Sequence, residues 1–164
     1  MIAKRGNVLW VPKMTGNLTN TMIMAFDTSK GHGKNVIACC ATINDTFSEY
    51  LSKTSTFANN DDKFNEMVKL SFEIINNASK KNQKCTKEIV IFHNSCSFDQ
   101  VALFKNFFLD TLINKLSETF GDQCPKLSLV MVNTKTSERF FTNDNRGGAN
   151  NVQAGTIVAD DIVS

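Results

Sequence analysis

An aspartate that closes an apolar run is the first candidate for chemistry in this chain. Residues 21–27 are almost continuously apolar and end in Asp27, which is typical of a strand buried on both faces. The end of such a strand is the usual place for a functional site in an α/β layer. A second interpretation needs no function, because an aspartate there also caps the turn that follows the strand. Both interpretations of Asp27 stay open on these residues alone.

The cysteines and histidines do not form a metal-binding pattern. The chain has five cysteines and no Cys-x-x-Cys pair. Cys39 and Cys40 are adjacent in an apolar run, where successive side chains of a strand point to opposite faces. The two histidines, His32 and His93, are far apart in the sequence. We therefore expect no zinc site, and we expect reduced thiols in a cytoplasmic or nuclear protein.

Size and composition are those of one globular domain. The chain has 164 residues, of which 41% are hydrophobic and 21% charged, and this excludes disordered, collagen-like and membrane-bundle proteins. The net charge of +2 is too small to establish a nucleic-acid surface by itself. The apolar runs are far shorter than the roughly 20 residues that span a bilayer, and no secretory signal is visible, so we expect no membrane partner.

Periodicity predicts the elements that position these residues. Apolar and β-branched runs predict five main strands, and spacings of three and four predict two helices between them. The strands are predicted at 21–27, 36–43, 46–56, 88–92 and 127–132, with a turn at 30–35. The first helix is predicted to start at 59–62, and the second to start near Ser97 and to stop at Gly121 and Pro125.

Shorter elements are predicted at both ends of the chain. Residues 8–11 are predicted as a short strand, 139–141 as a further sheet edge, 143–151 as a polar loop and 155–158 as a closing strand. Three strands in a meander, followed by two right-handed crossovers, give one mixed sheet flanked by helices. The predicted class is therefore α/β with the ribonuclease-H-like order of elements.

Several strings resemble the PIWI domain of Argonaute and Piwi proteins. Residues 21–27 (Thr-Met-Ile-Met-Ala-Phe-Asp) resemble its first strand, and residues 3–7 (Ala-Lys-Arg-Gly-Asn) resemble the segment that leads into it. Residues 88–92, followed by His-Asn-Ser, resemble the strand that ends Tyr-Arg-Asp in the family. Residues 129–141 resemble its basic strand and turn, and residues 155–158 (Gly-Thr-Ile-Val) its Gly-Thr-Val-Val ending. The matches occur in family order.

The resemblance implies a metal site for RNA cleavage and assigns residues to it. Family members that cut RNA hold two divalent metals, Mg²⁺ or Mn²⁺, between carboxylates and a late histidine, so that one metal activates water and both stabilise charge. Asp27 matches the first of these carboxylates. Asp62 lies nearest the family's glutamate, with Asp61 as the alternative. Both are also explained as acids that favour a helix N-terminus.

Ser95 occupies the position of the family's second metal-binding aspartate. A neutral hydroxyl brings no charge and binds a hard dication more weakly than a carboxylate does. Asp99 is close in sequence, but it is better explained as an acid at a helix start. His93 is either a ligand or, more commonly for such a residue, a hydrogen-bonded structural histidine. The family's final histidine falls beyond Ser164, so we expect Mg²⁺ or Mn²⁺ to be weakly bound or absent.

The resemblance also implies nucleic-acid contacts. Lys4 matches a family lysine at the guide 5′ phosphate, and Lys135 and Arg139 match positions that touch the guide backbone. Such contacts need one cation per phosphate and are independent of sequence. Each of the three is otherwise a solvated surface charge. Thr134 departs from the family, which has a second basic residue there.

These expectations combine into one functional hypothesis with two alternatives. Residues 1–18 are expected to connect from the junction of the Mid and PIWI domains, and residues 19–164 to form a partial PIWI domain. The expected partners are a small guide RNA and its complementary target RNA, with the rest of an Argonaute protein or other silencing factors. The hypothesis is guided binding in RNA silencing without cleavage. The alternatives are an active metal-dependent RNA endonuclease and a truncated fragment without function.

Overall fold

The computed structural model describes residues 11, 13, 16, 18–31, 33–58, 60–82, 85–94, 98–132, 139–143 and 147–159. The chain divides into two compact units, Met1–Thr134 and Lys135–Ser164. The first unit holds the main sheet and the helices, and the second holds a small hairpin. Most of the residues predicted as a strand at 8–11 lie outside the described part, and Val11 has no regular structure.

The first unit is built on a five-stranded mixed sheet. Its strands are β1 (Thr21–Gly31), β2 (Lys34–Thr42), β3 (Tyr50–Phe57), β4 (Glu88–Asn94) and β5 (Lys126–Val132). They lie in the order β3-β2-β1-β4-β5. The first three form an antiparallel meander, and β4 and β5 join in parallel. This confirms the predicted ribonuclease-H-like order of three strands, helix, strand, helix, strand.

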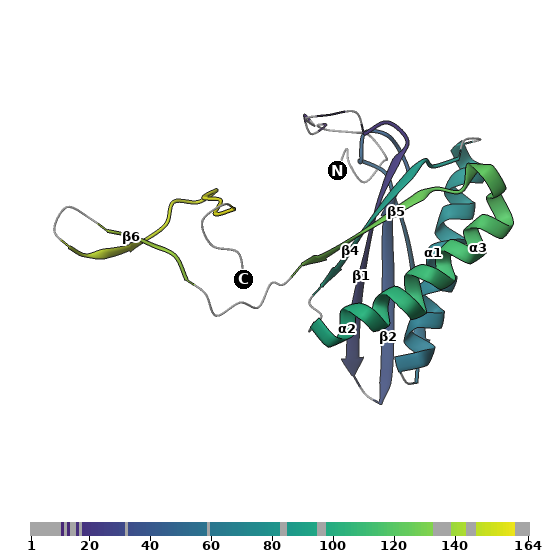
Figure 1. Ribbon diagram of the computed structural model, residues 1–164, viewed down its shortest axis with the longest axis horizontal. Helices are drawn as coiled ribbons and strands as arrows, with labels where there is room; N and C mark the ends of the chain where they lie inside the picture. Colours follow the sequence, from purple (N-terminus) through teal and green to yellow (C-terminus); the bar gives the residue numbers. More distant parts are fainter. Residues whose placement is uncertain are drawn as a thin grey trace, which may run out of the picture. The chain divides into compact units, whose positions relative to one another are not determined.

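The helices lie on one side of this sheet (Figure 1). Helix α1 (Asn60–Asn82) buries the stripe Met67, Leu70, Ile74 and Ala78. A second helical run comprises α2 (Phe98–Leu103), a π-helical segment (Phe104–Leu109) and α3 (Asp110–Phe120). It buries Phe104, Phe108, Leu112 and Leu116, the stripe that the sequence predicted. The second helix was predicted as one uniform helix, and the π-helical segment is an addition to that prediction.

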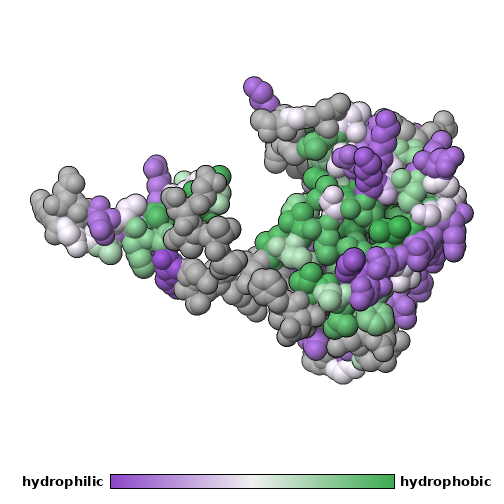
Figure 2. Space-filling view, in the orientation of Figure 1, coloured by the Kyte–Doolittle hydropathy of each residue, from purple (hydrophilic) through white to green (hydrophobic). Residues whose placement is uncertain are grey.

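The opposite face of the sheet is not covered by a described helix. On β1, Met22, Met24 and Phe26 are buried, whereas Ile23 is partly exposed and Ala25 is exposed. The prediction that residues 21–27 are buried on both faces is therefore wrong for the described structure, in which burial alternates. Figure 2 shows hydrophilic residues over the outer surfaces of α1 and α3, and apolar residues gathered over the strands. No helix among the described residues is long and apolar enough to cross a membrane.

Two predicted boundaries move, because β1 and β2 pair further than their apolar residues extend and because residues 44–49 form a loop before β3. β1 continues past Asp27 to Gly31, and the predicted turn shortens to the hairpin tip, where Gly33 has a φ of 76°. β3 begins at Tyr50 rather than at residue 46. Polar residues of β1 and β2 thus stay in the ladder, because backbone pairing does not depend on side-chain polarity.

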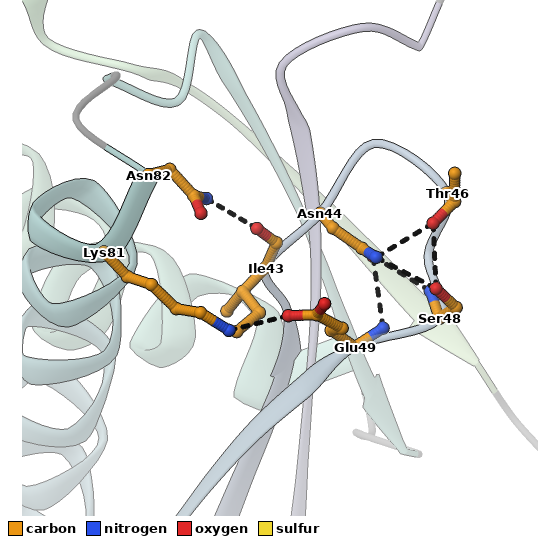
Figure 3. Close-up of polar contacts among 7 residues, drawn as sticks. All are labelled: Ile43, Asn44, Thr46, Ser48, Glu49, Lys81 and Asn82. Carbon is orange, nitrogen blue, oxygen red and sulfur yellow. Dashed lines mark hydrogen bonds and ion pairs between the residues drawn. The ribbon is translucent and has the colours of Figure 1, made fainter. Parts of the chain in front are cut away.

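Residues 44–49 form a loop held by one asparagine (Figure 3). The Oδ1 atom of Asn44 accepts hydrogen bonds from the backbone N–H groups of Ser48 (2.9 Å) and Glu49 (3.1 Å). Its Nδ2 atom donates to the hydroxyls of Thr46 (2.8 Å) and Ser48 (2.9 Å). The last turn of α1 is tied to the same loop, because Lys81 pairs with Glu49 at 2.6 Å.

The second unit contains a short antiparallel hairpin of β6 (Phe141–Asn143) and β7 (Ala149–Asn151). The predicted edge at 139–141 is thus shifted to begin at Phe141. The prediction of a loop at 143–151 is wrong at Asn143 and at Ala149–Asn151, because these residues belong to the two strands of the hairpin. The prediction of a strand at 155–158 is also wrong, since these residues have no strand partner in the described structure, and Ile157 is 86% exposed.

Candidate functional site

Asp27 lies on β1 beside the C-terminal end of β4. The parallel register pairs Phe26 with His93, which places Asp27 level with Asn94, the last residue of β4. Asp27 is exposed, and its Oδ1 atom accepts a hydrogen bond from the backbone N–H of Thr28 at 2.8 Å. Since β1 continues to Gly31, no turn follows Asp27, and the contact lies within the strand rather than capping a turn. The strand that leads to Ser95 is thus the neighbour of the strand that carries Asp27.

The two strand ends present different residues to the two faces of the sheet. We call the face of the sheet that carries the helices the helical face, and the face that no described helix covers the open face. Side chains alternate along a strand, so Phe26 and His93 point to the helical face. Asp27 and Asn94 accordingly lie on the open face, where both are exposed. The open face at this point therefore has one carboxylate and one amide, and His93 lies on the other side of the sheet from them.

His93 is enclosed by the helical layer. It is 7% exposed, and its ring meets the ring of Phe104 edge-on with centroids 4.5 Å apart. Burial first, and then the charge of Lys63, lower the pKa of His93 to about 4, although the backbone hydrogen bond with Asn94 and the charge of Asp27 act in the opposite direction. The imidazole is therefore neutral at pH 7. Its surroundings are those of the structural histidine that was one of the two sequence interpretations.

The start of α1 reaches the same end of the sheet. The Nδ2 atom of Asn35 on β2 donates to the carbonyl of Ala58 at 3.3 Å, so the chain enters α1 beside the β1–β2 hairpin. Phe64, in the second turn, meets Phe104 edge-on at 5.7 Å. Asp62 is the third residue of α1, and Asp61 precedes it. The backbone thus brings the predicted acidic position and Asp27 to one end of the sheet.

The described residues do not fit a two-metal centre. They contain no cluster of three or more His, Cys, Asp or Glu side chains that could hold a metal. Beside the C-terminal end of β4, Asp27 is the described carboxylate, and a pair of Mg²⁺ ions needs several such ligands. The side chains of Asp62 and Asp99 lie outside the described part, as does Ser95. The predicted ligand set therefore stays a prediction, and no chemical step is derived through a metal.

The predicted RNA contacts fall mostly outside the described residues. Lys4 and Lys135 are not described. Arg139 is described and exposed, and it belongs to the second unit. The assignment of these three side chains to an RNA backbone stays a prediction.

Lys63 is a residue near the site that sequence reasoning missed. It lies next to Asp62 in α1, it stands 6.0 Å from the ring centroid of Phe64, and its charge acts on His93. The sequence gives only a weak indication of this role, because Lys63 stands between two aspartates and the apolar residues that form the buried face of the helix. Its nearness to β4 depends on the packing of α1 against the second helical run.

The order of the strands in the sheet, with the helices that connect them, is that of a ribonuclease-H-like domain. The Piwi domain family model matches residues 1–164, and the chain belongs to that family. A Piwi-like protein of Dugesia japonica is 30% identical over an alignment of 152 residues, which covers 87% of this chain and 18% of that protein. The chain thus spans less than a fifth of the length of this relative.

Solved Argonaute and Piwi structures share the fold. The C-terminal lobe of a budding yeast Argonaute is 15% identical with a TM-score of 0.63, over 81% of this chain and 29% of that one. Kluyveromyces polysporus Argonaute with a guide RNA is 15% identical with a TM-score of 0.62, over 81% and 16%. Drosophila Piwi is 17% identical with a TM-score of 0.59, over 71% and 16%. At these identities the likeness establishes the fold.

Proposed function

We propose that this chain forms part of a Piwi protein that binds a small guide RNA and its complementary target RNA and does not cut the target. The proposal takes residues 1–18 as the connection from the Mid domain and residues 19–164 as a partial PIWI domain. The observation that carries it is the place of Asp27, exposed beside the end of β4 in a Piwi-family domain.

Nucleic-acid binding is supported by the family and by a structural relative. Kluyveromyces polysporus Argonaute, which shares this fold, was solved with a guide RNA. In this chain Lys4, Lys135 and Arg139 are the cations proposed to pair with RNA phosphates. Since such contacts release counterions, each one lost should lower the salt dependence of single-stranded RNA binding by about 0.7 in slope.

We infer the lack of cleavage from the side chains that would have to bind the two metal ions. Ser95 brings no negative charge at the position that the resemblance assigns to an aspartate, and the described carboxylate beside the C-terminal end of β4 is Asp27. Two dications close together need several carboxylates to neutralise them. The proposed state is one in which Mg²⁺ or Mn²⁺ binds weakly or not at all.

The binding test uses a fluorescent 5′-phosphorylated single-stranded RNA and the full chain. Lys4→Glu and Arg139→Glu are expected to weaken binding at every RNA sequence. Lys80→Glu is the matched control, because Lys80 is exposed in the last turn of α1, at the other end of the helix from Asp62. Equal affinity of all three variants would remove Lys4 and Arg139 from the proposed interface.

An active endonuclease is the second candidate, favoured because the start of α1 and Asp27 lie at the same end of the sheet. Ser95→Asp distinguishes the two candidates. If cleavage appears only in Ser95→Asp, the loss of activity is local to that position. If the natural chain already cuts a guide-matched target, the non-cutting proposal is wrong. A chain that neither binds RNA nor unfolds in a sharp thermal transition would support the truncated, non-functional alternative.

A further inference from the structure

We propose that Cys85 and Cys124 form a reversible disulfide, so that they are a thiol-oxidation site at the end of the sheet opposite Asp27. Both are free and half-buried. They line one cleft of about 480 Å³, together with Asn20, Thr86, Lys87 and Gln123. The proposal is independent of RNA binding.

Strand pairing brings the two cysteines together. Glu88 and Lys126 are register partners at the start of β4 and β5, and the N–H of Lys126 donates to the carbonyl of Lys87 at 2.9 Å. Cys85 lies two residues before Lys87, and Cys124 lies two residues before Lys126. Neighbouring strands run about 4.8 Å apart, and disulfides join Cα atoms about 4.4–6.8 Å apart.

Side-chain contacts place both sulfur atoms on the helical side. The Sγ atom of Cys85 donates to Oε1 of Gln123 at 3.2 Å, and Gln123 directly precedes Cys124. Ser79 of α1 contacts the Sγ atom of Cys85 at 3.8 Å, and Ser117 of α3 donates to that of Cys124 at 3.4 Å. Since α1 and α3 pack on one face, the two thiols approach the cleft from the same side.

The remaining described thiols are in different surroundings. Cys39 is fully buried, and burial, with the neighbouring Cys40, raises its pKa to about 12, so it holds its proton. Cys40 lies on β2 and on the open face of the sheet, where the hydroxyl of Ser52 donates to its Sγ atom at 3.2 Å. Cys40 is therefore a suitable control thiol with comparable exposure.

The oxidant class is a small disulfide such as oxidised glutathione. The thiolate of one cysteine attacks it, forms a mixed disulfide and releases one glutathione thiol. The second cysteine then attacks the protein sulfur of the mixed disulfide and releases the other glutathione. Two protein thiols are oxidised and one glutathione disulfide is reduced to two thiols. The product links the α1–β4 and α3–β5 connections and closes a loop of about 40 residues.

The test treats the full chain with oxidised glutathione and maps linked peptides by mass spectrometry without reduction. We expect Cys85–Cys124 as the main linked pair, and a rise in Tm of roughly 5 °C or more that dithiothreitol reverses. Cys85→Ser and Cys124→Ser should each abolish both effects, and Cys40→Ser should leave both intact.

Two results would overturn the proposal. One is recovery of Cys85 and Cys124 only as separate glutathione adducts or in pairs with other cysteines. The other is a rise in Tm that persists in Cys124→Ser. A chain that binds no RNA leaves the peptide map and the Tm comparison fully informative.

Discussion

Phe26 on β1 and His93 on β4 are register partners on adjacent parallel strands, and both are buried against the second helical run. Phe26 meets Phe108 edge-on at 5.5 Å, and His93 meets Phe104 at 4.5 Å. Because side chains alternate, this pair directs Asp27 to the open face. The aromatic core under the strand ends thus determines which polar residues face solvent there.

The buried histidine makes stability depend on pH. The pKa of His93 is about 4 in the folded chain and 6.5 ordinarily, so the unfolded chain binds the extra proton between these values. The contribution of the neutral His93 to the free energy of unfolding is therefore complete above pH 6.5. It is lost as the pH drops towards 4, which lowers the free energy of unfolding by on the order of 3 kcal/mol. Urea unfolding across this range is the measurement. His93→Phe should flatten the dependence relative to the natural chain, and His32→Gln should leave it in place; equal slopes in all three would contradict this origin.

The Asn44 loop should contribute measurable stability. Asn44→Ala removes two acceptor and two donor contacts, and leaves the N–H groups of Ser48 and Glu49 without their partner. We expect a loss of about 1–3 kcal/mol in the free energy of unfolding. Asn44→Asp keeps the acceptor oxygen and should recover part of the loss. If Asn44→Ala were as stable as the natural chain, the loop would be held by other contacts.

Two neighbouring phenylalanines of the π-helical segment differ strongly in burial, so one can be substituted as the test and the other as its control. Phe108 is fully buried and Phe107 is 51% exposed, stacked on Phe64 at 6.1 Å. Phe108→Ala should cost about 3–5 kcal/mol, because it opens a cavity beneath β1. Phe107→Ala should cost distinctly less. Chemical denaturation of both variants measures the difference, and equal losses would mean that the segment packs in another register.

Local sequence patterns predicted the main sheet because each strand and helix carries its own hydrophobic period. They predicted two-faced burial of β1 wrongly, since Ile23 and Ala25 are apolar whether or not a helix covers them. Residues 155–158 (Gly-Thr-Ile-Val) have no described partner strand, whereas Ala149–Asn151, two of whose three residues are asparagines, pair with Phe141–Asn143. In both cases a strand forms only where the backbone pairs with a second strand. The composition of one segment does not indicate whether such a partner exists.

The position of Asp27 beside β4 could be predicted from the sequence, but the surroundings of the candidate site could not. Asp27 and the end of β4 follow from two apolar runs that become parallel neighbours. The neutral state of His93 depends on Phe104 and Lys63, which come from two different helices. Such surroundings arise from tertiary packing, so an isolated histidine in a sequence does not indicate them. The π-helical segment was hidden for a related reason, because spacings of four are equally typical of an α-helix.

The most direct test of the central claim follows one labelled target RNA with the guide-loaded chain in Mg²⁺ and in Mn²⁺. A native gel reports how much target is retained, and a denaturing gel of the same sample reports whether it is intact. We predict retention of an intact target, lost when the target is not complementary to the guide. A cleavage product that disappears in Asp27→Ala, or no retention of a matched target, would contradict the account.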